Sequence, residues 1–184
     1  FEVQPDVDRP ESIVPPGRGV SYGTVHAMGG GLVMAGYRGE GYTWNLLRSV
    51  DDGRTWEPMG VVVVPPAPGQ RPYVKFAADA GRLWFATTEG HPREVQPSNV
   101  RVGVIDPRTG AITSAGGQAL GQVGPGVPVA SIPFAYRCPA SADAWISELR
   151  VIFGRPVLSV SLRGRRVDTA AGAWAHDHLR VMPA

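Results

Sequence analysis

The sequence predicts an all-β fold, and three observations lead to this prediction. The 24 glycines and 18 prolines are about twice the ordinary share for a chain of 184 residues, which disfavours long helices. Short apolar runs are separated by glycine and proline, and no stretch repeats apolar residues at the helical spacing i, i+3, i+4 and i+7. A hydrophobic fraction of 43% with only 18% charged residues still suffices for one folded domain.

Each apolar run bounded by turn-forming residues is expected to form a β-strand. In chain order, the expected strands are 22–27, 32–37, 42–49, 56–64, 73–77, 83–88, 99–105, 111–115, 144–152, 156–162 and 177–182. Two stretches rich in glycine and proline, 65–72 and 116–128, are expected to be connectors between units.

A loose internal repeat groups these strands into units. The segments VHAMGGGLVMAGYRG, VKFAADAGRLWFATTEG and SELRVIFGRPVLSVSLRG each read as strand, glycine turn, strand and loop. Their anchors Leu32, Leu83 and Val157 lie 51 and 74 positions apart. In the first two units a third strand and a hairpin to a fourth follow, which is typical of the four-stranded antiparallel blade of a β-propeller. The sequence therefore predicts a propeller with about three blades present in this chain.

The predicted ring is incomplete, because propellers usually close with four to eight blades. Residues 1–19 are expected to be an extended segment, and residues 20–184 a partial propeller with units at about 20–64, 71–115 and 129–184. Open end sheets would expose unpaired, partly apolar surfaces. We therefore expect further polypeptide, or another copy of the chain, to complete the propeller.

Charge and composition narrow the classes of partner. The net charge of +2 comes from scattered arginines rather than a basic stripe, so nucleic acid is not an expected partner. No apolar run approaches the length of a membrane-spanning helix.

The sequence predicts no metal site. The single Cys138 excludes an internal disulfide and a cysteine zinc site, while His176 and His178 lack a nearby third metal ligand. His26 is interpreted as a satisfied core histidine. No cofactor is predicted, and a requirement for structural calcium cannot be read from the sequence.

The strongest local motif is SVDDGRTW at 49–56, which fits the pattern S-x-D-x-G-x-T-W. Asp51 can hydrogen-bond turn amides, Gly53 can adopt positive φ, and Trp56 is expected to insert into the apolar layer below. With Ser49 and Thr55, these residues resemble the Asp-box of sialidase-type (BNR repeat) propellers. The resemblance implies a structural role for the motif, away from the substrate face.

A broader resemblance covers about residues 20–184. The segments that carry it are RPYVK at 71–75, EGHPRE at 89–94, DAWI at 143–146, GRPV at 154–157 and DHLR at 177–180. In this order they resemble the BNR_4-type family of carbohydrate-active propellers, which is similar in fold to polysaccharide lyases such as ulvan lyases and rhamnosyl-glucuronate lyases. The resemblance implies a fold that recognises polysaccharide.

A lyase acting on a uronic acid must neutralise the sugar carboxylate, remove the C5 proton and protonate the leaving oxygen. His91 is the expected general base or acid, Tyr37 its proton-transfer partner, and Arg38 or Arg93 the carboxylate clamp. Arg163 is expected to add positive charge for glycan binding. These residues follow equivalent strands and are expected to share one rim. The lyases that this chain resembles have a histidine in the early blade where Tyr37 and Arg38 stand.

Two functions remain open from the sequence. The first is a carbohydrate-recognising propeller that acts as a polysaccharide lyase on uronic-acid glycans by β-elimination, as the ordered motifs favour. The alternative is a non-enzymatic structural or receptor-binding module, such as a phage tail or cell-surface adhesion component, as the missing blades and proline-rich joints favour. Both imply an extracellular, virion-surface or cell-surface location, although no signal peptide is visible at the start of the sequence.

Overall fold

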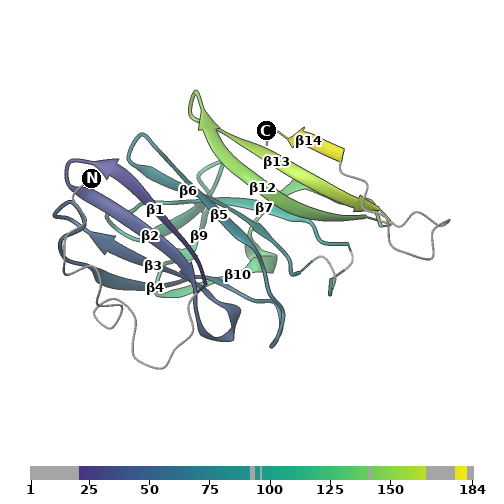
Figure 1. The fold of residues 1–184 in the computed structure, drawn as a ribbon, viewed down its shortest axis with the longest axis horizontal. Coiled ribbons are helices and arrows are strands. Elements are labelled where there is room, and N and C mark those ends of the chain that lie inside the picture. Colours follow the sequence, from purple (N-terminus) through teal and green to yellow (C-terminus); the bar gives the residue numbers. More distant parts are fainter. Residues whose placement is uncertain (1–20, 92–93, 96, 141, 165–176, 182–184) are drawn as a thin grey trace.

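The computed structural model describes residues 21–91, 94–95, 97–140, 142–164 and 177–181. This part of the chain is nearly all β and forms three sheets, none of which closes on itself (Figure 1). Its helical segments are two short 3-10 turns, η3 (Glu40–Tyr42) and η4 (Val129–Ser131). The all-β prediction is confirmed, whereas the number of blades stays a prediction.

The first sheet is an antiparallel meander extended by one parallel strand. Its strands are β1 (Ser21–Gly29), β2 (Leu32–Arg38), β3 (Trp44–Ser49), β4 (Glu57–Val64) and β10 (Pro125–Pro128). The order is β1-β2-β3-β4-β10, with β10 parallel to β4. In the β1–β2 hairpin Gly29, Gly30 and Gly31 all have positive φ, which explains the glycine run between two apolar segments.

The second and third sheets are antiparallel. The second contains β5 (Val74–Asp79), β6 (Arg82–Thr88), β7 (Val100–Ile105), β8 (Ala111–Ser114) and β9 (Ala119–Gln122) in sequential order, and β11 (Phe134–Tyr136) also pairs with β7. The third contains β12 (Ala142–Ile152), β13 (Arg155–Gly164) and β14 (Asp177–Val181). Every run expected to be a strand is a strand here, within two residues at each described end.

The expected connector at 116–128 is wrong, because it contains β9 and β10, while the stretch 65–72 is a loop as predicted. A close backbone approach explains the difference. Val61 and Gly124 exchange two backbone hydrogen bonds, at 3.1 and 2.9 Å. A Cβ built on Gly60 would lie 2.7 Å from the Gly124 Cα. The glycines that suggested a flexible joint therefore let two strands meet without side chains between them.

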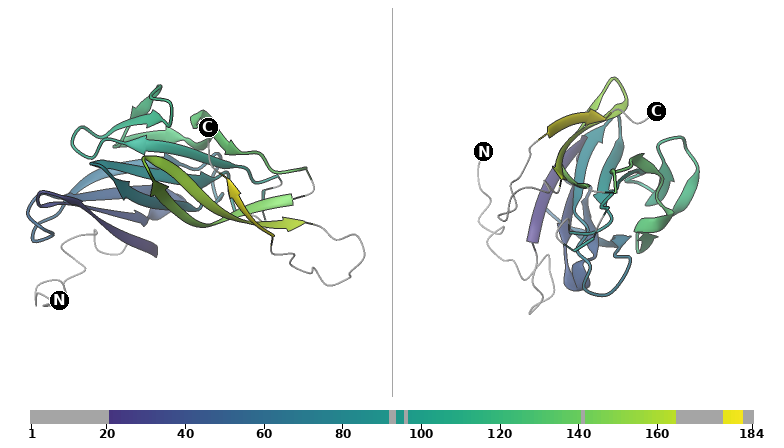
Figure 2. Two further views of the ribbon diagram at one scale, coloured as in Figure 1. Left: turned by 90° about the horizontal axis from the view of Figure 1, so that it is seen from above. Right: turned by 90° about the vertical axis from the view of Figure 1, so that its right-hand side faces the viewer.

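The second sheet is the middle layer of the molecule, with apolar cores on both faces (Figure 2). Along β6, Leu83 and Phe85 enter the core shared with the first sheet, whereas Trp84 and Ala86 enter the core shared with the third. Alternation in a strand sends neighbouring side chains to opposite faces, so a continuous apolar run matches a strand buried on both sides.

The leading strands of the three sheets lie next to one another. β5 contacts β1 on one side and β12 on the other, and Figure 1 shows it between them. Each of these strands is at an edge of its sheet. This arrangement brings residues near the ends of β1, β2, β5, β6 and β12 together and positions the candidate site.

A substitution at Gly36 tests how tightly the first two sheets pack. A Cβ at this position would overlap the ring of Phe76, which belongs to the core between the sheets. We expect Gly36→Ala to destabilise the protein by about 1–3 kcal/mol through overpacking, measured by denaturant unfolding. Gly116→Ala is the matched control, since its Cβ would meet only the Ser114 Oγ at 3.8 Å. Equal stability of the two variants would contradict this account of the packing.

Candidate functional site

Tyr73 is fixed at the entrance to β5 by its own backbone. Its amide donates to the Thr88 Oγ1 at 2.9 Å, and its carbonyl accepts from the Thr88 amide at 3.0 Å. The preceding carbonyl, of Pro72, accepts from the Trp44 indole at 2.8 Å. Tyr73 is 9% exposed, so its position is set by buried contacts from two sheets.

Three rings from separate segments meet at this point, and we call Tyr73, His91 and Trp145 the aromatic cluster. The ring centroids of Tyr73 and Trp145 are 4.3 Å apart, and His91 lies 5.6 Å from Tyr73 and 5.7 Å from Trp145. His91 follows β6 and Trp145 lies in β12, so the cluster joins the second and third sheets. The Thr88 hydroxyl also donates to the Gly90 carbonyl at 2.9 Å, linking the segments that carry Tyr73 and His91.

Arg38, the last residue of β2, brings a cation from the first sheet to the cluster. Its guanidinium carbon lies 5.6 Å from the Tyr73 ring, 4.5 Å from the Tyr22 ring and 5.4 Å from the Tyr42 ring. Its Nε donates to the Ser21 Oγ at 3.2 Å. Its Nη1 is buried and makes no hydrogen bond to the described residues. A buried donor without an acceptor suits an anionic or carbonyl oxygen of a ligand.

The surroundings of Tyr73 keep its hydroxyl protonated at neutral pH. Burial raises the pKa of Tyr73 above its ordinary value of 10.0, and hydrogen bonding with Tyr22 raises it further. Hydrogen bonding to the Arg38 guanidinium acts in the opposite direction without overcoming the first two effects. Tyr73 is therefore equipped to donate a proton.

A second ion pair lies beside the site. Arg71 forms a two-point salt bridge with Glu94, and its guanidinium carbon lies 5.8 Å from the Tyr42 ring. Hydrogen bonding from Arg71 holds the pKa of the Glu94 carboxyl below its usual range. The Arg71 guanidinium is therefore already paired with Glu94, whereas the Nη1 of Arg38 has no acceptor among the described residues.

A buried polar network supports the segment that carries His91. Arg101 is 6% exposed and donates to Glu89 from Nε at 3.1 Å and from Nη2 at 2.6 Å. It also donates to the carbonyls of Ala130 and Ile132. Asn99 donates to the Glu89 carboxylate at 2.8 Å. Glu89 is two residues before His91, so this network fixes the start of the loop from which His91 projects.

The structure brings together only some of the predicted site residues. Arg38 and His91 both lie against Tyr73. Tyr37 does not join them: Met34 and Gly36 face the second sheet, as Arg38 does, and alternation turns Tyr37 to the opposite face of β2. Arg93 and the side chain of Arg163 lie outside the described residues.

Sequence reasoning missed Tyr73, Trp145 and Tyr22. Two signals were present, because Tyr73 and Trp145 each belong to a segment that carried the family resemblance, RPYVK and DAWI. No periodicity marked them as functional, since both look like ordinary aromatic strand residues.

His26 was expected to be a satisfied core histidine, and the structure contradicts both parts: it is half-buried on the edge strand β1, and one ring nitrogen has no partner among the described residues. Its ring packs 6.3 Å from that of Phe76, and its Nε2 is buried without a hydrogen-bond partner among the described residues. Burial lowers the pKa of His26, so the ring is neutral at pH 7.

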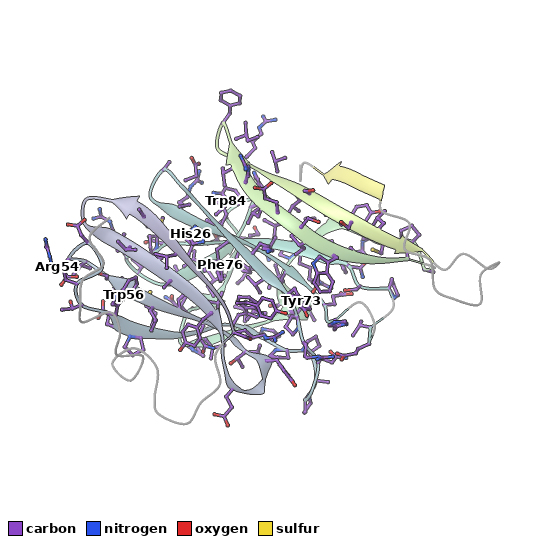
Figure 3. All side chains as sticks on the ribbon, viewed as in Figure 1. His26, Arg54, Trp56, Tyr73, Phe76 and Trp84 are labelled. Atoms are coloured by element: carbon purple, nitrogen blue, oxygen red, sulfur yellow. The ribbon has the colours of Figure 1, made fainter. Side chains whose placement is uncertain are left out.

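The SVDDGRTW turn has the hydrogen bonding expected of its sequence. Asp51 accepts from the Thr55 amide at 2.8 Å and from its hydroxyl at 2.7 Å, and Gly53 has a φ of 85°. The Trp56 indole donates to the Gly53 carbonyl at 2.9 Å. Trp56 therefore folds over its own turn and is not among the residues of the first core, which corrects the expected insertion. Figure 3 shows Arg54 and Trp56 well separated from Tyr73.

Acid should loosen this turn selectively. Hydrogen bonds from Thr55 and then Ser49 lower the pKa of Asp51 from 3.8 to about 2. The stabilisation by the carboxylate is fully present above pH 3.8 and is lost as the pH falls through about 2. We expect Asp51→Asn to lower the melting temperature at neutral pH, with the difference from wild type shrinking across this window. Asp52→Asn is the control, and an equal loss in both variants would contradict the role of Asp51.

The described residues hold no group of three metal-ligating side chains, and none of their helices could cross a membrane. The side chain of His178 and all of His176 lie outside the part of the chain that the structure describes.

Comparisons with known proteins show the fold and no more. No family model matches the sequence, and no curated protein matches it, so the BNR resemblance stays a prediction. Two solved structures of an ulvan lyase of polysaccharide lyase family PL25, one bound to -[GlcA(1-4)Rha3S]-, match with a TM-score of 0.72 and 16% sequence identity. The match covers 94% of this chain and 44% of the lyase, so the chain spans less than half the length of the protein it resembles.

Proposed function

We propose that this chain belongs to a carbohydrate-active protein that cleaves a uronic-acid polysaccharide by β-elimination. The observation that carries the proposal is the meeting of Arg38, Tyr73 and His91, which supplies a cation, a proton donor and an imidazole at one place. The fold it shares with an ulvan lyase supports a carbohydrate-active role.

Each step of the elimination has a candidate group. Arg38 would bind the sugar carboxylate and stabilise the negative charge that develops when the C5 proton leaves. His91 would take that proton as general base. The freed electron pair forms the C4–C5 double bond as the C4–oxygen bond breaks, and the Tyr73 hydroxyl protonates the departing oxygen. The products are an unsaturated uronate and a shortened chain, with no other reactant consumed.

In this scheme Tyr73 takes the proton-transfer role that was predicted for Tyr37. Arg38 binds the sugar carboxylate, because its Nη1 is a donor with no acceptor among the described residues. The raised pKa of Tyr73 favours the role of acid over that of base, since a base would need the ionised phenolate. Arg93 and Arg163 remain proposals for additional glycan contacts.

The proposed protein needs further sheets to resemble the lyase in full. We propose that additional polypeptide or a second copy of the chain supplies them, and that the protein acts outside the cell or on a cell or virion surface, where polysaccharide is met.

A non-enzymatic glycan-binding module is the second candidate. Its support is that the match covers only 44% of the lyase chain, so more than half of that protein's length has no counterpart here. Exposed tyrosines beside Arg38 suit adhesion as well as catalysis.

One experiment separates the two functions. The protein is incubated with ulvan and other uronic-acid polysaccharides, and the ultraviolet absorbance of the unsaturated product is followed. We expect absorbance to rise with wild type and with Gly116→Ala, and to stay flat with His91→Ala. Glycan binding without absorbance change would support the adhesion module and overturn the lyase.

A further inference from the structure

Two tyrosines that flank Arg38 adopt a backbone conformation that large side chains rarely take. Tyr22 has a φ of 59° and Tyr42 a φ of 62°. Tyr42 ends the 3-10 turn η3, and the other non-glycine residues with positive φ in the described chain, Asp52, Ala80 and Phe153, also belong to tight turns. Tyr22 instead lies in β1, at an irregularity in its pairing with β2. Such conformations cost free energy and cluster at ligand-binding sites.

Both tyrosine rings are accessible from outside. Tyr22 is 53% exposed and Tyr42 is 36% exposed, although each ring packs on the guanidinium of Arg38. Burying these rings elsewhere would be more favourable for an isolated protein. The fold instead holds two aromatic rings against one cation whose Nη1 has no acceptor among the described residues.

We propose that Tyr22 and Tyr42 form a stacking subsite for an acidic oligosaccharide, in which sugar rings lie on the two tyrosines and the acidic group between them binds Arg38. This inference rests on the proposed function and deepens it, because it assigns recognition of the neighbouring sugars to residues that take no part in proton transfer. The ligand it requires is at least a disaccharide, with an acidic group flanked by apolar sugar faces.

Tyr42 is the better residue to test, because Tyr22 also hydrogen-bonds Tyr73. The probe is an oligosaccharide of the repeat GlcA(1-4)Rha3S, the ligand bound in one of the related structures. Its binding to the full chain is measured by calorimetry in a His91→Ala background, which prevents turnover. We expect Tyr42→Ala to weaken binding about three- to tenfold, Tyr42→Phe to bind like the parent, and Phe153→Ala, an exposed aromatic on the β12–β13 hairpin, to have no effect.

A second measurement needs no ligand. At a φ of 62°, glycine should be more stable than alanine, so Tyr42→Gly should melt about 2–4 °C above Tyr42→Ala. The reverse order would overturn the strain argument and with it the proposal.

The outcomes distinguish this inference from the function on which it rests. Cleavage by wild type together with unchanged affinity in Tyr42→Ala would overturn the subsite and leave the lyase standing. Absence of both cleavage and binding of the probe would overturn both. Weakened binding in Tyr42→Phe would also overturn stacking, because the phenylalanine ring keeps the aromatic face.

Discussion

Replacing Tyr73 with phenylalanine is expected to lower the rate of β-elimination by about two to four orders of magnitude while leaving the fold intact. The variant removes only the hydroxyl that would protonate the leaving oxygen. The ring contacts with Trp145, at 4.3 Å, and with His91, at 5.6 Å, remain available to phenylalanine. Steady-state kinetics on ulvan and circular dichroism of the same preparation check the two halves of this expectation.

The pH dependence gives a second signature of Tyr73. Because its pKa is raised above 10.0, the hydroxyl keeps its proton through the neutral range, and the alkaline loss of activity caused by ionisation of Tyr73 should begin only at pH values above 10.0. The Tyr37→Phe variant is the matched control, since Tyr37 faces away from the cluster and should retain full activity. Normal turnover in Tyr73→Phe would rule out this residue as the acid.

Replacing Arg101 with alanine is expected to destabilise the protein by about 3–5 kcal/mol. The variant leaves the Glu89 carboxylate, whose side chain is only 19% exposed, without its ion-pair partner. It also removes the hydrogen-bond donor to the carbonyls of Ala130 and Ile132. Loss of a partner from a buried pair costs more than the pair contributes when intact, because the remaining charge stays desolvated. Urea unfolding measures the change.

Acidification should remove the benefit of this network in the wild type. Burial raises the pKa of Glu89, but hydrogen bonds from Arg101 and Asn99 outweigh burial and hold it below 4.5. The stabilisation is thus complete above pH 4.5 and is lost as the pH falls through the lower folded value. Arg150→Ala is the control, because the Arg150–Glu148 pair is 70% and 53% exposed and should contribute less than about 1 kcal/mol. A similar loss in both variants would contradict a special role for Arg101.

The sequence was most informative where side chains decide the structure. Apolar runs such as 83–88 are strands because their residues fill cores on both faces, and hydrophobicity records that directly. It failed for β9 and β10, where backbone pairing and close approach at glycines decide the structure, and for β11, a three-residue strand defined by its pairing with β7. A glycine in the sequence does not show whether it forms a flexible loop or allows a neighbouring backbone to approach closely.

The candidate site was predicted in part for a related reason. Arg38 and His91 were found because polar residues at strand ends stand out among apolar runs. Tyr37 was predicted and Tyr73 was missed because position along a strand does not reveal which face a side chain takes. A shift of one residue reverses that face, so adjacent residues such as Tyr37 and Arg38 end on opposite sides of the sheet.

The single hydroxyl of Thr88 has a consequence for how such a protein changes over time. Because it ties the Tyr73 and His91 segments together within the second sheet, the proposed acid and base are joined directly, with no residue of the first sheet between them. Tyr22 and Tyr42 belong to that other sheet. Mutations in the first sheet can therefore change which polysaccharide is preferred, while the proposed acid and base, Tyr73 and His91, stay unchanged in the second sheet.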